Sequence, residues 1–163
     1  MRSLLSLILF ALTVVHATAA TVSAELSPTQ QVAYEGPINQ QIPAVVLIKR
    51  GAGDSVAADL IVNFTVGGTA TLTTDYALSS VSTLTMSTIT IAAGQQSASI
   101  IITPAFDTTP EGQETVVIQL TTGTGYTLAA QNSVDVPIAD DDVSVWLETP
   151  KPLAYEDYTT GQP

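Results

Sequence analysis

The sequence has 163 residues, of which 15 are Asp or Glu and only 4 are Lys or Arg, so its formal charge is −11. So few cations cannot form the basic face that nucleic-acid phosphates require, and the lack of Cys excludes disulfides, thiolate metal sites and thiol nucleophiles. Because 45% of the residues are hydrophobic and 12% are charged, the composition indicates a folded domain. Its acidity suits a hard dication such as Ca²⁺, which prefers oxygen ligands.

The first twenty residues have the pattern of a secretory signal peptide. Arg2 gives a short positive region, an apolar run covers residues 4–15, and Ala-Thr-Ala at 17–19 offers a cleavage site. We therefore predict a signal peptide at 1–20, a secreted or cell-surface location and no membrane insertion of the mature domain. A membrane anchor is the alternative. Cleavage after residue 19 would remove His16, the single histidine and the usual type of general base.

Between residues 21 and 142, apolar and polar residues alternate in short segments that end near Gly, Pro or Asp. This period of two predicts β-strands, and no window has an apolar stripe at helical spacing. The pattern occurs in seven segments: 22–26, 44–48, 60–66, 84–91, 98–102, 116–120 and 134–138. About seven strands with frequent turns predict an all-β fold, an antiparallel β-sandwich.

The residues after 142 repeat the start of this unit. At a constant offset of 121 positions, residues 143–163 align without gaps on residues 22–42, and seven of the 21 pairs are identical. We interpret 21–142 as one complete unit and 143–163 as the first strand of a truncated second repeat in a tandem array. Chance similarity of two polar stretches is one alternative, and addition of this tail to a neighbour's sheet is another.

Eight carboxylates stand at predicted strand ends or in turns, where the loops of a sandwich gather. They are Glu35, Asp75, Asp107, Glu111, Glu114, Asp140, Asp141 and Asp142. Neighbouring carboxylates repel one another, and a bound dication reverses the sign of that interaction. Flexible all-oxygen coordination favours Ca²⁺ over Mg²⁺, and a mature chain without His or Cys disfavours Zn²⁺. A solvated acidic surface without metal is the alternative.

The order of short motifs across residues 32–142 resembles that of a Calx-β domain. The motifs include Ala-Tyr-Glu-Gly at 33–36, Thr-Asp-Tyr at 74–76, Asp-Thr-Thr-Pro-Glu-Gly-Gln-Glu at 107–114 and Ile-Ala-Asp-Asp-Asp at 138–142. The resemblance implies an immunoglobulin-like sandwich of about seven strands, in which loops at one end bind calcium near the boundary with the next domain. It places the ligands at the eight carboxylates. Phe106 stands where exchanger-type members carry an acidic residue.

Three functions of different classes fit these features. We predict a calcium-binding extracellular repeat module of a surface or adhesion protein, in which Ca²⁺ rigidifies the joint with the adjacent repeat and other surface proteins are partners. The second hypothesis is a metal-free structural spacer in the same array. The third is a glycosidase using two carboxylates, which is disfavoured because aromatic residues for sugar stacking are few and no nucleophile motif is present. We therefore predict no enzymatic activity.

Overall fold

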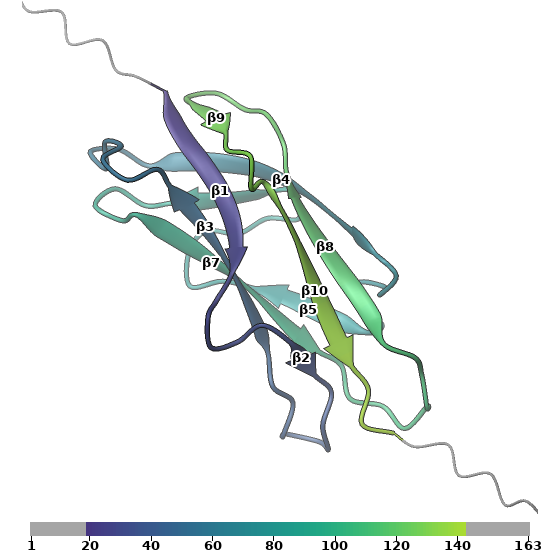
Figure 1. Cartoon of the computed structure of the whole chain (residues 1–163). Coiled ribbons are helices and arrows are strands. Elements are labelled where there is room, and N and C mark those ends of the chain that lie inside the picture. Colours follow the sequence, from purple (N-terminus) through teal and green to yellow (C-terminus); the bar gives the residue numbers. More distant parts are fainter. Residues whose placement is uncertain (1–18, 143–163) are drawn as a thin grey trace, which may run out of the picture.

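The computed structural model describes residues 19–142, and ten β-strands account for all of the regular structure in this part of the chain. The strands are β1 (Ala20–Leu26), β2 (Ala33–Tyr34), β3 (Ala44–Arg50), β4 (Leu60–Gly68), β5 (Tyr76–Ser79), β6 (Thr88–Ile91), β7 (Ser97–Pro104), β8 (Glu114–Leu120), β9 (Tyr126–Leu128) and β10 (Ser133–Ala139). They form two five-stranded sheets, ordered β5-β7-β3-β1-β9 and β2-β10-β8-β4-β6 (Figure 1). The predicted all-β sandwich is confirmed.

The number of strands and two of the pairings differ from the prediction. Each of the seven alternating segments contains a strand, but β2, β5 and β9 are additional and have two, four and three residues. Alternation is not visible in segments this short. The sheets are mixed rather than purely antiparallel, because β1 pairs with β9 and β10 pairs with β2 in parallel. Both parallel pairs join strands that are distant in sequence, since a tight turn cannot connect parallel neighbours.

Alternating side chains on the long strands build the core between the two sheets. In β3, Ala44, Val46 and Ile48 are fully buried, while the residues between them are partly exposed. Phe64 of β4 and Ile118 of β8 contribute buried side chains from the second sheet. Removal of these apolar surfaces from water holds the sheets together.

Two polar side chains fasten loops at the end of the sandwich where β1 begins. Arg50 is 7% exposed, and its guanidinium donates to three backbone carbonyl oxygens at 2.7–3.1 Å. The hydroxyl of Tyr126 donates to the carbonyl oxygen of Thr121 at 2.7 Å and accepts from the N–H of Asn63 at 2.9 Å. These bonds satisfy backbone groups where the chain passes between strands.

Strand direction places the beginning and the end of the described chain at opposite ends of the sandwich (Figure 1). Strands β1, β4, β7 and β10 finish at the same end, and β3, β5 and β8 begin there. Four segments therefore gather at this end: 27–43, which includes β2, the loops 69–75 and 105–113, and residues 140–142. We call it the acidic end.

Two sequence predictions fall largely or wholly outside the described residues. These are the signal peptide, of which only residues 19 and 20 are described, and the second-repeat segment at 143–163. Within residues 19–142, no helix has the length and apolar character needed to cross a membrane.

Candidate metal centre

The acidic end carries all eight carboxylates that the sequence singled out. Glu35 directly follows β2, and Asp75 directly precedes β5. Asp107 and Glu111 lie on the loop between β7 and β8, and Glu114 is the first residue of β8. The remaining three, Asp140, Asp141 and Asp142, follow β10. The structure thus brings together residues that are far apart in the sequence.

The first group of carboxylates is formed by Glu35, Asp140 and Asp141. One oxygen from each lies within 4.8 Å of the others. Strand β2 runs parallel to β10, and the N–H of Glu35 donates to the carbonyl oxygen of Ala139 at 3.0 Å. This backbone pairing fixes Glu35 beside the residues that follow β10. Glu35 is only 5% exposed, so its carboxylate is held away from bulk water.

The second group is formed by Asp75, Glu111 and Glu114, whose carboxylate oxygens also lie within 4.8 Å of one another. Asp75 is 8% exposed, and its Oδ2 accepts the N–H of Thr71 at 2.6 Å. The N–H of Asp75 donates in turn to the carbonyl oxygen of Thr71 at 2.9 Å. These two bonds close the turn that carries Asp75 and set the position of its side chain.

A close approach of two strands anchors that turn beside the start of β8. Gly68, the last residue of β4, has a φ of +112°, and a Cβ there would lie 2.1 Å from the carbonyl oxygen of Thr115. The N–H groups of Thr69 and Ala70 both donate to the same oxygen, at 2.9 and 3.1 Å. Only glycine permits this contact, which brings the 69–75 loop next to Glu114.

Asp140 connects the two groups. Its Oδ2 accepts the N–H of Glu111 at 2.6 Å, and its Oδ1 accepts the N–H of Asp142 at 2.7 Å. The loop between β7 and β8 is therefore tied to the segment after β10. Asp107 and Asp142 are members of neither group. Both nevertheless interact electrostatically with the first group, Asp107 with Glu35 and Asp142 with Asp140 and Asp141.

Crowding of the carboxylates perturbs their protonation. Burial raises the pKa of Glu35 from 4.5 to about 7, and the charges of Asp140, Asp107, Glu111 and Asp141 add to this rise. The ionised form is thus disfavoured both by loss of water and by like charge. In the metal-free protein, Glu35 therefore takes up a proton at a much higher pH than an ordinary glutamate does.

Three further carboxylates also have raised pKa values. Desolvation is the largest cause for Glu111, Glu114 and Asp142, and neighbouring carboxylates contribute in each case. The Oε2 of Glu114 and the Oδ2 of Asp142 are inaccessible to solvent and have no hydrogen-bond partner among the described residues. A buried carboxylate oxygen without a donor is unfavourable unless a cation neutralises it. This donor set fits a hard metal ion.

The basic residues of the described chain do not neutralise the acidic end. They are Lys49 and Arg50, at the end of β3 that points away from it. The Nζ of Lys49 pairs with Glu25 at 2.9 Å, and Arg50 donates to backbone carbonyls. Among residues 19–142, the excess negative charge therefore has no cationic side chain beside it.

The arrangement into two groups was not predicted from the sequence. Strand order indicates which loops share an end, but the grouping depends on backbone bonds such as the one from Glu111 to Asp140. Phe106, which the resemblance identified as a departure, is 40% exposed next to Asp107. The assignment of the eight carboxylates as metal ligands stays a prediction.

The sandwich is similar to solved structures of Calx domains. The apo-form Calx CBD1 domain matches with a TM-score of 0.56 and 21% identity, covering 77% of this chain and 100% of that chain. CBD12 from CALX1.2 matches with a TM-score of 0.53 and 24% identity, covering 74% of this chain and 44% of that chain. These likenesses show that the chain has the fold of Calx domains, so the Calx-β resemblance of the sequence is confirmed at the level of the fold.

A structure described as the calcium binding domain CBD12 of CALX1.1 matches with a TM-score of 0.48 and 24% identity, over 61% of this chain and 38% of that chain. No protein-family model and no curated protein sequence matches the chain.

Proposed function

We propose that this domain binds calcium at the acidic end. The observation that carries the proposal is the joint presence of two carboxylate groups and two buried carboxylate oxygens without hydrogen-bond partners. Each group would hold one ion, with Asp107 and Asp142 beside them as further oxygen donors. Calcium supplies the positive charge that the described residues lack at this end, and it accepts six to eight oxygen ligands in flexible geometry.

Calcium is favoured over the other common dications by the donor atoms. All of the side chains in the two groups are carboxylates, whereas zinc sites use mainly Cys and His. Magnesium keeps several waters and requires near-ideal octahedral geometry, which suits one or two carboxylates rather than a crowded set. The Calx-β resemblance of the sequence implies the same ion.

We also propose that the domain is a repeat of an exported surface or adhesion protein, and that calcium rigidifies its joint with the next unit. The predicted signal peptide and the sequence repeat after residue 142 support this role. The described chain ends at Asp142, at the acidic end, so a following unit would begin beside the carboxylates (Figure 1). Three exposed hydrophobic side chains at this end, Tyr34 of β2 and Ile38 and Ile42 of the loop after it, offer a surface for that unit.

A metal-free spacer is the second candidate, and one observation favours it. The pKa of Glu35, raised to about 7 by burial and by neighbouring carboxylates, allows a proton to relieve part of the repulsion near neutral pH. In that case the acidic end would respond to pH and not to calcium. The tandem arrangement would be unchanged.

Thermal unfolding distinguishes the two candidates. The thermal unfolding midpoint of the chain from Ala20 to Pro163 is measured in EDTA and then in Ca²⁺ up to about 10 mM. This concentration is about ten times the highest dissociation constant typical of extracellular calcium modules. Because calcium would bind the folded form, the midpoint should climb with concentration. Mg²⁺ at the same concentrations is the control and should raise it much less. A midpoint that ignores calcium over the whole range would contradict calcium binding and leave the spacer.

A further inference from the structure

Strand β7 lacks a neighbour along half of one edge. On one side it pairs with β3 from Ser97 to Ile102. On the other side it pairs with β5 only from Ile101 to Pro104. In the described chain, residues 97–100 therefore form an open strand edge within the first sheet, at the side of the sandwich.

The register shows which backbone groups this edge exposes. The N–H of Arg50 donates to the carbonyl oxygen of Gln96 at 2.9 Å, and hydrogen-bonded pairs then recur at every second residue, so Ala98 bonds to β3. The N–H and C=O groups of Ser97 and Ser99 point the opposite way. Among the described residues, no backbone group bonds to them there. Four polar groups in a row are thus free to pair.

The neighbouring strand stops just before it would cover this edge. The backbone carbonyl oxygen of Asp75 accepts the N–H of Ala105 at 2.8 Å, and the pairing continues to Ser79 opposite Ile101. The next residue due to pair is Val81, but it has left the sheet and is 90% exposed. The line of β5 is therefore vacant beside Ser97 and Ser99.

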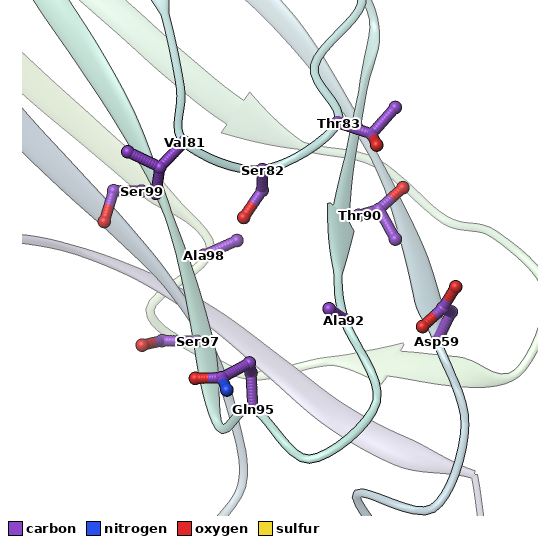
Figure 2. Close-up of a pocket in the computed structure, with 10 residues that line it drawn as sticks. All are labelled: Asp59, Val81, Ser82, Thr83, Thr90, Ala92, Gln95, Ser97, Ala98 and Ser99. Carbon is purple, nitrogen blue, oxygen red and sulfur yellow. The ribbon is translucent and has the colours of Figure 1, made fainter.

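A groove of about 610 Å³ lies beside the vacant position, between β7 and β6 (Figure 2). Its walls carry the hydroxyl groups of Ser82 and Thr90, and Asp59 stands at the side away from β7 (Figure 2). Ala98 points into the space between the two strands, whereas Ser99 lies on the other face of β7 (Figure 2). Small side chains at the base leave room for a side chain that enters from the vacant strand position.

We propose that this edge accepts a short extended segment of a partner protein that carries a lysine or arginine. The segment would follow the line of β5 and pair its backbone with Ser97 and Ser99. Its residue opposite Ala98 would then place its side chain in the groove, since alternate residues of a strand share a face. Asp59 is the single charged residue that lines the groove, so a cationic side chain is the complementary one.

The geometry favours a short segment over a second copy of this domain. An incoming strand is limited on one side by Ser79, which lies opposite Ile101, and on the other side by the turn at Gly94, which precedes β7. The open edge between these limits has room for about four residues. Two copies of β7 paired antiparallel about Ala98 would bring the partner's Gln95 opposite Ile101, where β5 already lies. A chain terminus or a narrow loop avoids this clash.

The test is a nuclear magnetic resonance titration of the chain from Ala20 to Pro163 with a defined peptide. The probe is the acetylated, amidated tripeptide Val-Lys-Val, which fits the gap and places lysine opposite Ala98 and a valine opposite each serine. We expect saturable shifts of the Ser97 and Ser99 amide resonances and slower hydrogen exchange at both. The same peptide N-methylated at both valines cannot donate to the edge and should not bind.

The charge preference has its own variant. Asp59→Asn retains the Oδ1 that accepts the N–H of Ala93 at 2.8 Å, so the loop bond is preserved. The substitution should weaken binding of the lysine peptide about 2- to 5-fold, as expected for a solvent-accessible ion pair. It should not affect a peptide with norleucine in place of lysine. Asp135→Asn, at an exposed position of β10, removes the same charge elsewhere and is the matched control.

Four results would overturn the proposal. The first is the absence of shifts at Ser97 and Ser99 at the highest peptide concentration. The second is equal binding of the N-methylated peptide, which would show that the strand edge is not used. The third is that Asp135→Asn weakens binding of the lysine peptide as much as Asp59→Asn does, which would show that the peptide responds to the net charge of the domain and not to Asp59. The fourth is protection of both amides without peptide that grows with protein concentration, which would assign the edge to a second copy.

Discussion

Replacing Glu35 with Gln is expected to stabilise the calcium-free domain at pH 8 and to have little effect at pH 5. The carboxyl of Glu35 has its pKa raised from 4.5 to about 7 by burial and by four neighbouring carboxylates. The folded state therefore holds this proton more tightly than the unfolded state does. Its stabilising contribution is complete below pH 4.5 and is lost as the pH rises to about 7, because the folded protein must then carry a buried, repelled charge.

The size of the effect follows from the pKa difference. A rise from 4.5 to about 7 corresponds to about 3 kcal/mol, at roughly 1.4 kcal/mol per pKa unit. The neighbouring carboxylates titrate together with Glu35, so part of the cost of its ionisation is shared with them. We therefore expect Glu35→Gln to raise the free energy of unfolding at pH 8 by about 2–3 kcal/mol. For a domain of this length, that is about 8–12 °C in the unfolding midpoint. At pH 5 the gain should fall below about 1 kcal/mol.

The assay is urea denaturation in EDTA at both pH values, for the parent chain and the variant. Glu25→Gln is the matched control, since Glu25 is 43% exposed and paired with Lys49, so its removal should cost less than about 1 kcal/mol at either pH. With calcium present, Glu35→Gln should lose part of the calcium-dependent stabilisation. A variant that is less stable than the parent at pH 8, by the same amount as at pH 5, would refute the electrostatic argument for the acidic end.

The other predictions concern single side chains. Asp141→Asn should reduce the rise of the unfolding midpoint with Ca²⁺ in differential scanning fluorimetry, and a rise equal to that of the parent would remove this residue from the site. Arg50→Met should lower the free energy of unfolding in urea by about 3 kcal/mol, because three carbonyl oxygens lose a charged donor, without altering the calcium concentration at half effect. Tyr126→Phe should lower it by about 1–2 kcal/mol, since the N–H of Asn63 loses its acceptor; no loss would indicate that water replaces the hydroxyl.

The sequence predicts the long strands well because each buries one face. In β7, the residues Ala98, Ile100 and Ile102 are buried while Ser99 and Ile101 between them are only partly buried, and this period of two is visible in the sequence. The short strands give no such signal. Strand β2 has two residues and is formed by pairing with β10 more than 100 positions later. Such a strand is defined by its neighbour and not by its own residues.

The candidate site is predictable in its members but not in its grouping. Each carboxylate stands at a strand end, and the alternating direction of the strands brings those ends together. The division into two groups depends on the path of the 105–113 loop, where the N–H of Glu111 donates to Asp140. The open edge at Ser97 and Ser99 was also not predicted, because it results from Val81 leaving the sheet and not from a motif.

The two ends of the sandwich differ in what surrounds their buried charged groups. At the end where β1 begins, the buried guanidinium of Arg50 donates to three carbonyl oxygens through its two terminal nitrogens, although its Nε has no hydrogen-bond partner among the described residues. At the acidic end, Glu35 and Asp75 are buried among like charges. Repulsion there opposes folding at neutral pH, and the apolar core must supply the excess stability. Bound calcium would turn this repulsion into attraction without changing the core. Its effect would therefore be limited to the acidic end and to the segment that follows Asp142. The groove beside β7 is lined by Asp59, by the loop before β6, by the turn between β6 and β7 and by residues of these two strands, none of which belongs to either carboxylate group. Failure of the calcium proposal would therefore leave the peptide proposal intact, and the converse holds.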